Sequence, residues 1–272
     1  MGTILASDGT RLHVEAEGQG LPVLLSGGLC TTHVNFAPQV APLVAAGCRV
    51  VRWDYRGHGR SGVPLEPAAY TLEQVVDDLG RAAEVASRSE PVVLGGLSFG
   101  GLASLHFALR RPERVRALLL FGSGPGFKNP EAAARWQAQC DRTAEFLETR
   151  GLEAFVAGRS GRTVVGLEPE LPEARAAAAA AIAQDPRGLA LFARLVGGPA
   201  RPVMDELGQI RVPVLVLVGE LDEPYLRAAD VLAAKLPHAR KVVLAGAGHI
   251  ANLERREAFD RALLDFLAGL PR

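Results

Sequence analysis

The stretch VVLGGLSFGGLASL, residues 92–105, decides the fold, because it changes character around Ser98. It begins as a β-branched, apolar run typical of a buried strand, and from Phe99 it continues with helical spacing. Ser98 lies at the junction, with Gly96 and Gly100 on either side in the pattern G-x-S-x-G. Between a strand and a helix this pattern predicts a strained turn that exposes the serine hydroxyl at the carboxyl edge of a sheet. Ser98 is therefore a candidate nucleophile.

The length is ordinary for a single α/β domain that carries an insertion. The chain has 272 residues, of which 48% are hydrophobic, so a sizeable core can form. The 30 Lys and Arg residues balance the 30 Asp and Glu residues, which argues against nucleic acid or an anionic membrane as a partner. The sequence shows neither a membrane span nor a signal peptide. We expect a cytoplasmic protein, monomeric or homodimeric, that acts on a small molecule.

Neither a metal nor a cofactor is expected. Three widely spaced cysteines, Cys30, Cys48 and Cys140, suggest a reducing compartment and form no disulfide or metal pattern. The segment GHGRSG, residues 57–62, matches the dinucleotide pattern G-x-G-x-x-G. That pattern requires a helix directly after it, and the following VPLEPAAYT carries two prolines that prevent one. We therefore expect a turn there and no bound dinucleotide.

Predicted strands alternate with helical segments along most of the chain. Val- and Leu-rich runs of this kind are typical of parallel strands buried on both faces, and the alternation predicts a doubly wound, mostly parallel α/β sheet. An antiparallel hairpin that turns at Asp8-Gly9 precedes it. The predicted strands are residues 20–28, 48–54, 91–98, 114–122, 212–220 and 239–246, and the clearest helices are 71–87, 99–110 and 257–267.

Residues 127–205 interrupt this alternation. They contain no convincing strand, and residues 131–149 and 173–197 have the composition and spacing of helices. Strand patterns resume at Val212. We predict a core formed by residues 1–126 and 206–272, with residues 127–205 as a helical insertion.

A serine nucleophile requires a base, and His249 is the best placed histidine. It lies in AGAGHIANLE, just after the last predicted strand and before the final helix, so it shares the carboxyl edge with Ser98. His106 falls inside the helix that follows the serine, and His13 belongs to the leading hairpin. The histidines are His13, His33, His58, His106, His238 and His249.

The acid that orients the base is expected in LVLVGELDEPY, residues 215–225. Asp222 lies just beyond the end of this strand, and the order Ser98, Asp222, His249 is the one expected for this arrangement. Glu220 is a rival because it is nearer the strand end, and Asp205 is a second, weaker rival.

Two backbone N–H groups are needed for the oxyanion of an acyl-transfer reaction. We expect one from Phe99, directly after the serine, and the other from the loop at the end of the predicted strand 20–28. Gly28 is the preferred donor in that loop because a glycine lets the backbone approach the substrate, and Leu29 is the alternative.

These motifs together resemble the α/β-hydrolase superfamily over nearly the whole chain outside the insertion. WDYRGHGRSG resembles its D-x-R-G-x-G-x-S segment, GLSFGG its nucleophile elbow, GELDEP its acid loop and GAGHIANLE its histidine loop. The resemblance implies Ser98 as nucleophile, Asp222 as acid and His249 as base, and it places the insertion where the family has its helical cap. Where relatives commonly carry His-Gly, this chain has Ser26-Gly27-Gly28.

A serine at the elbow narrows the expected reaction. Family members that act on haloalkanes or epoxides use an aspartate there, so hydrolysis of a carboxylic ester, lactone or thioester through an acyl-serine is favoured. The alternatives are hydrolysis of a carbon–carbon bond in a ring-fission product, which favours an additional cation, and a non-hydrolytic member (acyltransferase, cyclase or binder). Candidate cations are Arg135, Arg159, Arg162 and Arg194, and candidate pocket aromatics are Trp136, Phe146, Phe155 and Phe192.

Overall fold

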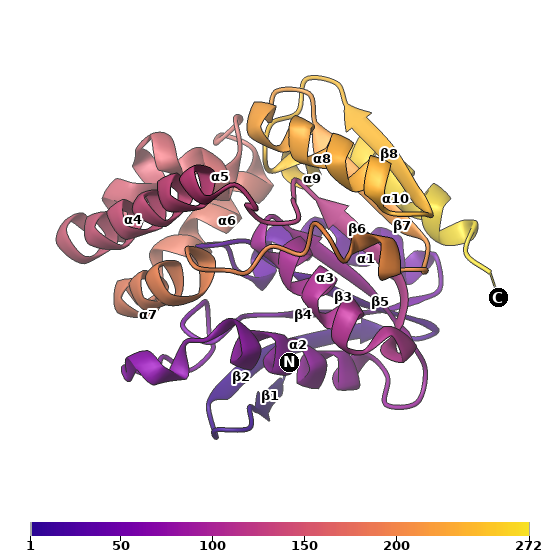
Figure 1. Ribbon diagram of the computed structural model, residues 1–272, viewed down its shortest axis with the longest axis horizontal. Coiled ribbons are helices and arrows are strands. Elements are labelled where there is room, and N and C mark those ends of the chain that lie inside the picture. The colour runs from indigo at the N-terminus through magenta and orange to yellow at the C-terminus, as the bar shows by residue number, and fades with distance from the viewer. Residues whose placement is uncertain (1, 272) are drawn as a thin grey trace.

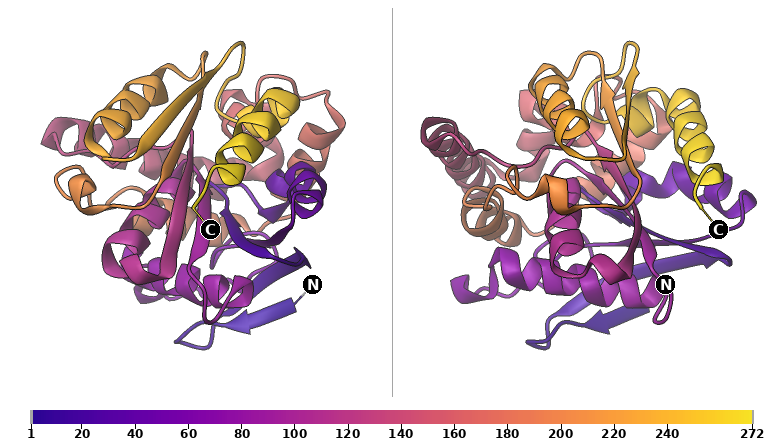
Figure 2. Two further views of the ribbon diagram at one scale, coloured as in Figure 1. Left: turned by 90° about the vertical axis from the view of Figure 1, so that its right-hand side faces the viewer. Right: turned by 45° about the vertical axis from the view of Figure 1, so that its right-hand side comes forward.

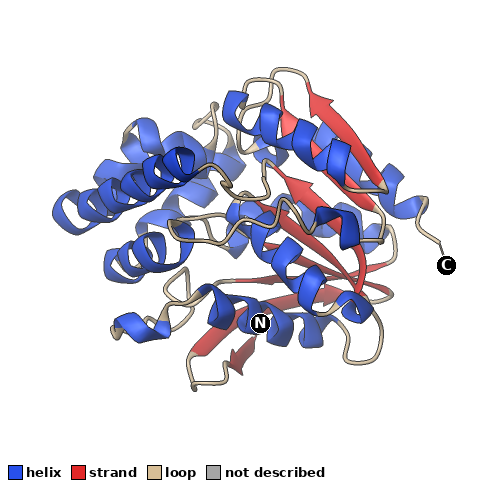
Figure 3. Cartoon of the chain, viewed as in Figure 1, coloured by secondary structure: helices blue, strands red, loops and turns tan. Residues whose placement is uncertain are grey.

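The described residues of the computed structural model, 2–271, form one eight-stranded sheet with the strand order β1-β2-β4-β3-β5-β6-β7-β8 (Figures 1 and 3). The pairs β1–β2 and β2–β4 are antiparallel and the remaining pairs are parallel. This confirms the doubly wound, mostly parallel sheet and its leading hairpin. The strands are β1 (Gly2–Leu5), β2 (Arg11–Gly18), β3 (Leu21–Ser26), β4 (Cys48–Trp53), β5 (Val92–Leu97), β6 (Val115–Phe121), β7 (Val214–Gly219) and β8 (Ala239–Leu244).

Helices cover both faces of the sheet (Figure 2). Side chains alternate between the faces, so Leu24 and Leu94 join the apolar cluster on one side, while Leu25 and Val93 join the cluster on the other. All residues of β5 and β7 are buried between these layers. One face carries α2 (Leu72–Ala86), α3 (Phe99–Arg110) and α8 (Glu223–Lys235), and the other carries α1 (Ala37–Ala45), α9 (Ala251–Glu254) and α10 (Arg256–Ala268).

The segment 127–205 contains helices and no strand among its described residues, and its helices gather at the left of Figure 1. Its apolar cluster includes Leu147, Phe155 and Leu189. We call residues 127–205 the helical segment. Its helices are α4 (Pro130–Ala157), α5 (Arg162–Val165), α6 (Pro172–Ile182) and α7 (Pro186–Phe192).

Two of these helices differ from the sequence prediction. The chain continues helically beyond residue 149, but Gly151 adopts φ 78° and breaks α4 into two parts. The single helix expected at 173–197 is divided, because Asp185 caps a new helix and Pro186 cannot continue the old one. A short π-helical turn, Ala193–Gly197, follows α7.

The three cysteines are buried free thiols. Among residues 2–271, no helix has both the length and the hydropathy to cross a membrane.

Candidate active site

Ser98 occupies a strained turn between β5 and α3. Its backbone adopts φ 53° and ψ −115°, and for a residue other than glycine this conformation is costly. The neighbouring glycines make the turn possible, since a Cβ on Gly96 would lie 2.1 Å from the carbonyl carbon of Gly100. A Cβ on Gly100 would in turn lie 2.5 Å from the Ser26 oxygen. The sequence pattern therefore reports a real steric requirement at this turn.

Asp222 and His249 form a hydrogen-bonded pair at the carboxyl edge of the sheet. Asp222 follows β7 and directly precedes α8, while His249 lies between β8 and α9. His249 Nδ1 is 2.7 Å from Asp222 Oδ2, and both side chains are largely buried. A proton on Nδ1 that is directed at the carboxylate leaves Nε2 as the basic nitrogen of the ring.

Gly122, at the end of β6, makes room for this pair. It adopts φ 46°, and a Cβ there would lie 3.1 Å from His249 Nδ1 and 3.2 Å from Asp222 Oδ2. The sequence analysis did not single out this glycine. The sequence did offer a clue to its role, because Gly122 directly follows a buried strand and so lies on the edge of the sheet that carries Ser98.

The rival carboxylates lie elsewhere. Glu220 is exposed and accepts a hydrogen bond from the Gly246 N–H at 2.8 Å. Asp205 is also exposed and forms an ion pair with Lys128 at 2.8 Å. The described structure therefore brings Asp222 to His249 and leaves both rivals with other partners.

The hydroxyl of Ser98 is hydrogen-bonded to a tyrosine. Ser98 Oγ lies 3.1 Å from Tyr225 Oη, and within residues 2–271 no hydrogen bond joins it to His249. Tyr225 also packs on the His249 ring, with 4.7 Å between ring centroids. Burial of the Tyr225 hydroxyl raises its pKa above the ordinary value of 10.0. Sequence reasoning missed Tyr225, because an aromatic in the first turn of a helix is most often a packing residue.

The two predicted backbone donors differ in their availability. Phe99 is the first residue of α3, so its N–H has no acceptor within the helix. The Gly28 N–H already donates to Thr31 Oγ1 at 2.7 Å, which argues against Gly28 as the second donor. The Leu29 N–H, in contrast, has no hydrogen-bond acceptor among the described residues. The local geometry therefore favours Leu29, the alternative that the sequence had left open.

His58 holds the loop that carries the Gly28 and Leu29 amides. Cys30 adopts φ 65°, and its N–H donates to His58 Nε2 at 3.3 Å. His58 Nδ1 donates to the Arg56 oxygen, also at 3.3 Å, which makes Nε2 the acceptor nitrogen. Burial lowers the pKa of His58 from 6.5 to about 4, so the ring is neutral at ordinary pH. Gln184 of the helical segment donates to the Cys30 oxygen at 2.9 Å.

The glycine-rich segment 57–62 forms turns, as expected. The Gly57 N–H donates to the Gly62 oxygen at 2.9 Å, and the next α-helix begins only at Leu72. A helix N-terminus for a pyrophosphate is thus missing at this position.

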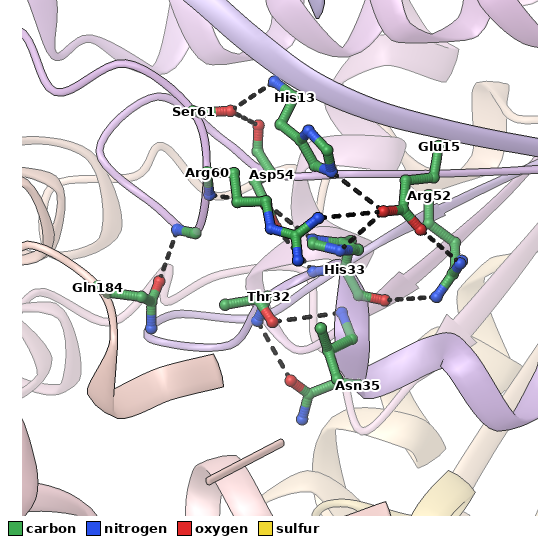
Figure 4. A network of polar contacts seen from close by, with 12 residues as sticks. His13, Glu15, Thr32, His33, Asn35, Arg52, Asp54, Arg60, Ser61 and Gln184 are labelled. Atoms are coloured by element: carbon green, nitrogen blue, oxygen red, sulfur yellow. Dashed lines mark hydrogen bonds and ion pairs between the residues drawn. The ribbon is translucent and has the colours of Figure 1, made fainter. Parts of the chain in front are cut away.

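A buried network of charged side chains lies beside the loop (Figure 4). Glu15 of β2 faces Arg52 of β4 in the sheet register, and their side chains form an ion pair at 2.8 Å. His33 Nδ1 is bonded to Asp54 Oδ2 at 2.8 Å, and the His33 N–H donates to the other oxygen of that carboxylate at 2.7 Å. The network therefore ties two strands to the short helix that follows the loop.

Part of this network has the composition of a metal site. His13 Nε2 and His33 Nε2 lie 3.3 Å and 3.4 Å from Glu15 Oε1, and the three ligand atoms lie within 4.8 Å of one another. However, the other oxygen of Glu15 pairs with Arg52, and Arg60 lies 3.5 Å from Oε1. Two guanidinium groups beside one carboxylate disfavour a further cation. The contacts favour an ion-pair network that needs no metal.

Two chambers meet at Ser98. The chamber that we call polar is a cavity of about 240 Å³. It contains the polar groups of the cleft, which are His249, Asp222, Gln139, Thr143, Ser160 and Thr163, but apolar side chains such as Trp136 and Phe155 also line it. The apolar chamber is a cavity of about 380 Å³ lined mainly by apolar groups, including Phe99, Leu102, Pro125, Phe127 and Ala200. Residues that line both chambers mark their boundary, and they are Leu29, Ser98, Trp136, Pro224 and Tyr225.

The helical segment contributes to this cleft, but not with every aromatic residue that was predicted. Trp136 lines both chambers and Phe155 lines the polar one. Phe192 is fully buried and packs on Phe99, and Phe146 is partly exposed and packs near Phe155. The described lining of both chambers includes no Lys or Arg side chain.

Comparison with known proteins identifies the family of the fold. The sequence profile of the α/β hydrolase fold matches residues 22–256. The chain belongs to the α/β-hydrolase family. A crystal structure of the enol-lactonase from Burkholderia xenovorans LB400 is similar, with a TM-score of 0.82 and 28% identity, over 98% of this chain and 100% of that one.

Alignments with two sequence relatives cover nearly the whole length of both chains. A putative carbamate hydrolase RutD from Rhizobium rhizogenes is 31% identical over 94% of this chain and 97% of its own. A putative 2-succinyl-6-hydroxy-2,4-cyclohexadiene-1-carboxylate synthase from Bacillus subtilis is 29% identical over 99% of this chain and 100% of its own. Together with the family, the relatives named as hydrolases support a hydrolase.

Proposed function

We propose that this protein is a serine hydrolase that cleaves a small, uncharged carboxylic ester through an acyl intermediate on Ser98. The observation that carries the proposal is the Asp222–His249 pair, at 2.7 Å, beside a cleft that Ser98 also lines. An activated serine needs a base and a group that orients the base, and these residues can supply both.

The reaction proceeds in two halves. Ser98 Oγ attacks the ester carbonyl while its proton passes to His249 Nε2, and Asp222 holds the ring in the required tautomer. The N–H groups of Phe99 and Leu29 stabilise the tetrahedral oxyanion. Its collapse breaks the bond to the alcohol oxygen, and His249 returns the proton to that oxygen. Water then attacks the acyl group with His249 as base, which releases the acid and restores the Ser98 hydroxyl.

The chambers suggest how the substrate lies. His249 must protonate the departing alcohol, and His249 lines the polar chamber, so the alcohol portion belongs there. The acyl portion then occupies the apolar chamber beside Phe99. In this proposal residues 127–205 act as a cap over a core of residues 1–126 and 206–272. Trp136 and Phe155 are the cap aromatics that contact the substrate.

The absence of a lining cation favours an ester over a carboxylate-bearing ring-fission product. A substrate with a free carboxylate would need a positive partner once desolvated. The candidate arginines of the helical segment are outside the described lining, and Arg194 forms an ion pair with Glu148 at 2.6 Å instead. The similarity to an enol-lactonase agrees with this choice, because a lactone is a cyclic ester.

The test combines labelling with kinetics. A fluorophosphonate should label Ser98, and Ser98→Ala should lower the hydrolysis of p-nitrophenyl esters by about 10⁴-fold or more. Ser104→Ala is the matched control, because Ser104 is a buried serine of α3, the helix that follows Ser98, and its hydroxyl donates to the Gly100 backbone oxygen. Turnover by Ser98→Ala within a few-fold of the wild type would refute the nucleophile. A preference for half-esters that carry a free carboxylate over neutral esters would refute the substrate class.

A further inference from the structure

Tyr225 is the hydrogen-bonding partner of the candidate nucleophile, and it belongs to the turn that carries the acid. Its backbone N–H donates to the Asp222 oxygen at 2.9 Å, so the positions of the two residues are coupled. The Tyr225 hydroxyl lies 3.1 Å from Ser98 Oγ, and its ring packs against His249. One side chain thus contacts both groups between which the proton must move.

The contact has a consequence for proton transfer. A serine hydroxyl has one proton, and nucleophilic attack requires that proton to point at His249 Nε2. In the described structure the oxygen is turned to Tyr225 instead. Either hydroxyl can donate the Ser98–Tyr225 bond. Because no hydrogen bond joins Ser98 Oγ to His249 among residues 2–271, the Ser98 hydroxyl must leave the orientation in which it contacts Tyr225 and turn toward His249 Nε2 before the reaction begins.

We propose that Tyr225 is a positioning residue that holds Ser98 in a resting orientation until a substrate enters the cleft. This inference rests on the proposed function. Ser98 and Tyr225 both line both chambers, so a substrate that spans the chambers must contact the pair. Substrate binding then breaks the bond and frees Ser98 to turn to His249.

The hydrogen bond between Tyr225 and Ser98 should not change with pH near neutrality, because the Tyr225 hydroxyl does not lose its proton there. Burial of its hydroxyl raises its pKa above 10.0, so the group keeps its proton under ordinary conditions. A neutral hydrogen bond of this kind changes an equilibrium by about two- to tenfold. The same factor reduces the fraction of free enzyme in which Ser98 is ready to react.

The decisive variant is Tyr225→Phe, which removes the hydroxyl and keeps the ring that packs on His249. Tyr70→Phe is the matched control, since Tyr70 is a buried tyrosine whose hydroxyl has no hydrogen-bond partner among the described residues. The first measurement is the second-order rate of Ser98 phosphorylation by diethyl p-nitrophenyl phosphate. Tyr225→Phe should react about two- to tenfold faster than the wild type, and Tyr70→Phe at the wild-type rate.

Two further readouts separate this role from a loss of packing. For a p-nitrophenyl ester, kcat/KM should rise by the same factor while kcat stays unchanged, because the bond is already broken in the saturated complex. The acceleration should also be equal at about pH 6 and about pH 9, since Tyr225 stays protonated. An unchanged or slower reaction of Tyr225→Phe overturns the inference while Ser98 labelling stands. Absence of Ser98 labelling in the wild type overturns the proposed function, and this inference with it.

Discussion

Protonation of His58 should destabilise the fold below neutral pH. Burial holds the folded pKa of His58 at about 4, while the unfolded chain titrates near 6.5. Between these values the unfolded state binds a proton that the folded state does not, so the free energy of unfolding falls as the pH falls through this window. The two values differ by about 2.5, and at about 1.4 kcal/mol for each pKa unit the full loss is about 3–4 kcal/mol. Most of this loss, about 3 kcal/mol, should be reached at pH 4.

The variant His58→Gln tests this magnitude. A glutamine oxygen can still accept the Cys30 N–H that His58 Nε2 accepts at 3.3 Å, but it does not titrate. Urea unfolding, followed by tryptophan fluorescence from about pH 7.5 to about pH 4, should show a decline in the wild type that exceeds the variant's by about 3 kcal/mol. His238→Gln, at an exposed site, controls for the loss of a histidine. Superimposable pH profiles for wild type and His58→Gln would refute the reasoning.

Two further predictions concern the geometry of the site. Gly122→Ala should lower kcat/KM by about 10²-fold, because its Cβ would lie 3.1 Å from His249 Nδ1. Gly47→Ala is the control, because it adds similar backbone strain at φ 80° but its Cβ would have no other atom within 4 Å. It should lower the free energy of unfolding by about 1–2 kcal/mol and leave the activity unchanged. Equal losses of kcat/KM in the two variants would contradict this prediction. Replacing the backbone amide of Leu29 by an ester should lower kcat by about 10²–10³-fold, and the same change at Gly28 should have a smaller effect. The reverse order would reinstate Gly28 as the donor.

The order of strands and helices was predictable, because buried parallel strands have a near-continuous apolar sequence that few other structures share. That Asp222 and His249 lie on the same edge of the sheet was also predictable, because parallel strands place the loops at their carboxyl ends on one edge. The prediction ended the first helix of the helical segment at residue 149, just before the break at Gly151, and it missed the helical residues that follow the break up to Ala157.

What could not be predicted depends on side-chain directions. Whether Gly28 or Leu29 offers a free amide is decided by the Thr31 hydroxyl, which closes a local hydrogen bond that leaves no periodic signal. Tyr225 belongs to a helix whose pattern is amphipathic, so only the three-dimensional structure shows its hydroxyl beside Ser98. The charged network of Glu15 and Arg52 had a weak signal in the alternation of β2, but the pairing of β2 with β4 was needed to interpret it.

The division of the cleft at Ser98 bears on the choice between hydrolysis and group transfer. On the proposed mechanism the alcohol leaves the polar chamber while the acyl group is still bound in the apolar one. Any hydroxyl compound that refills the polar chamber then competes with water for the acyl group. Gln139 and Thr143 line that chamber, and neither belongs to the proposed catalytic residues. Their affinity for an alcohol relative to water sets the partition, so a chain of this design can change from a hydrolase to an acyltransferase while Ser98, Asp222 and His249 stay as they are.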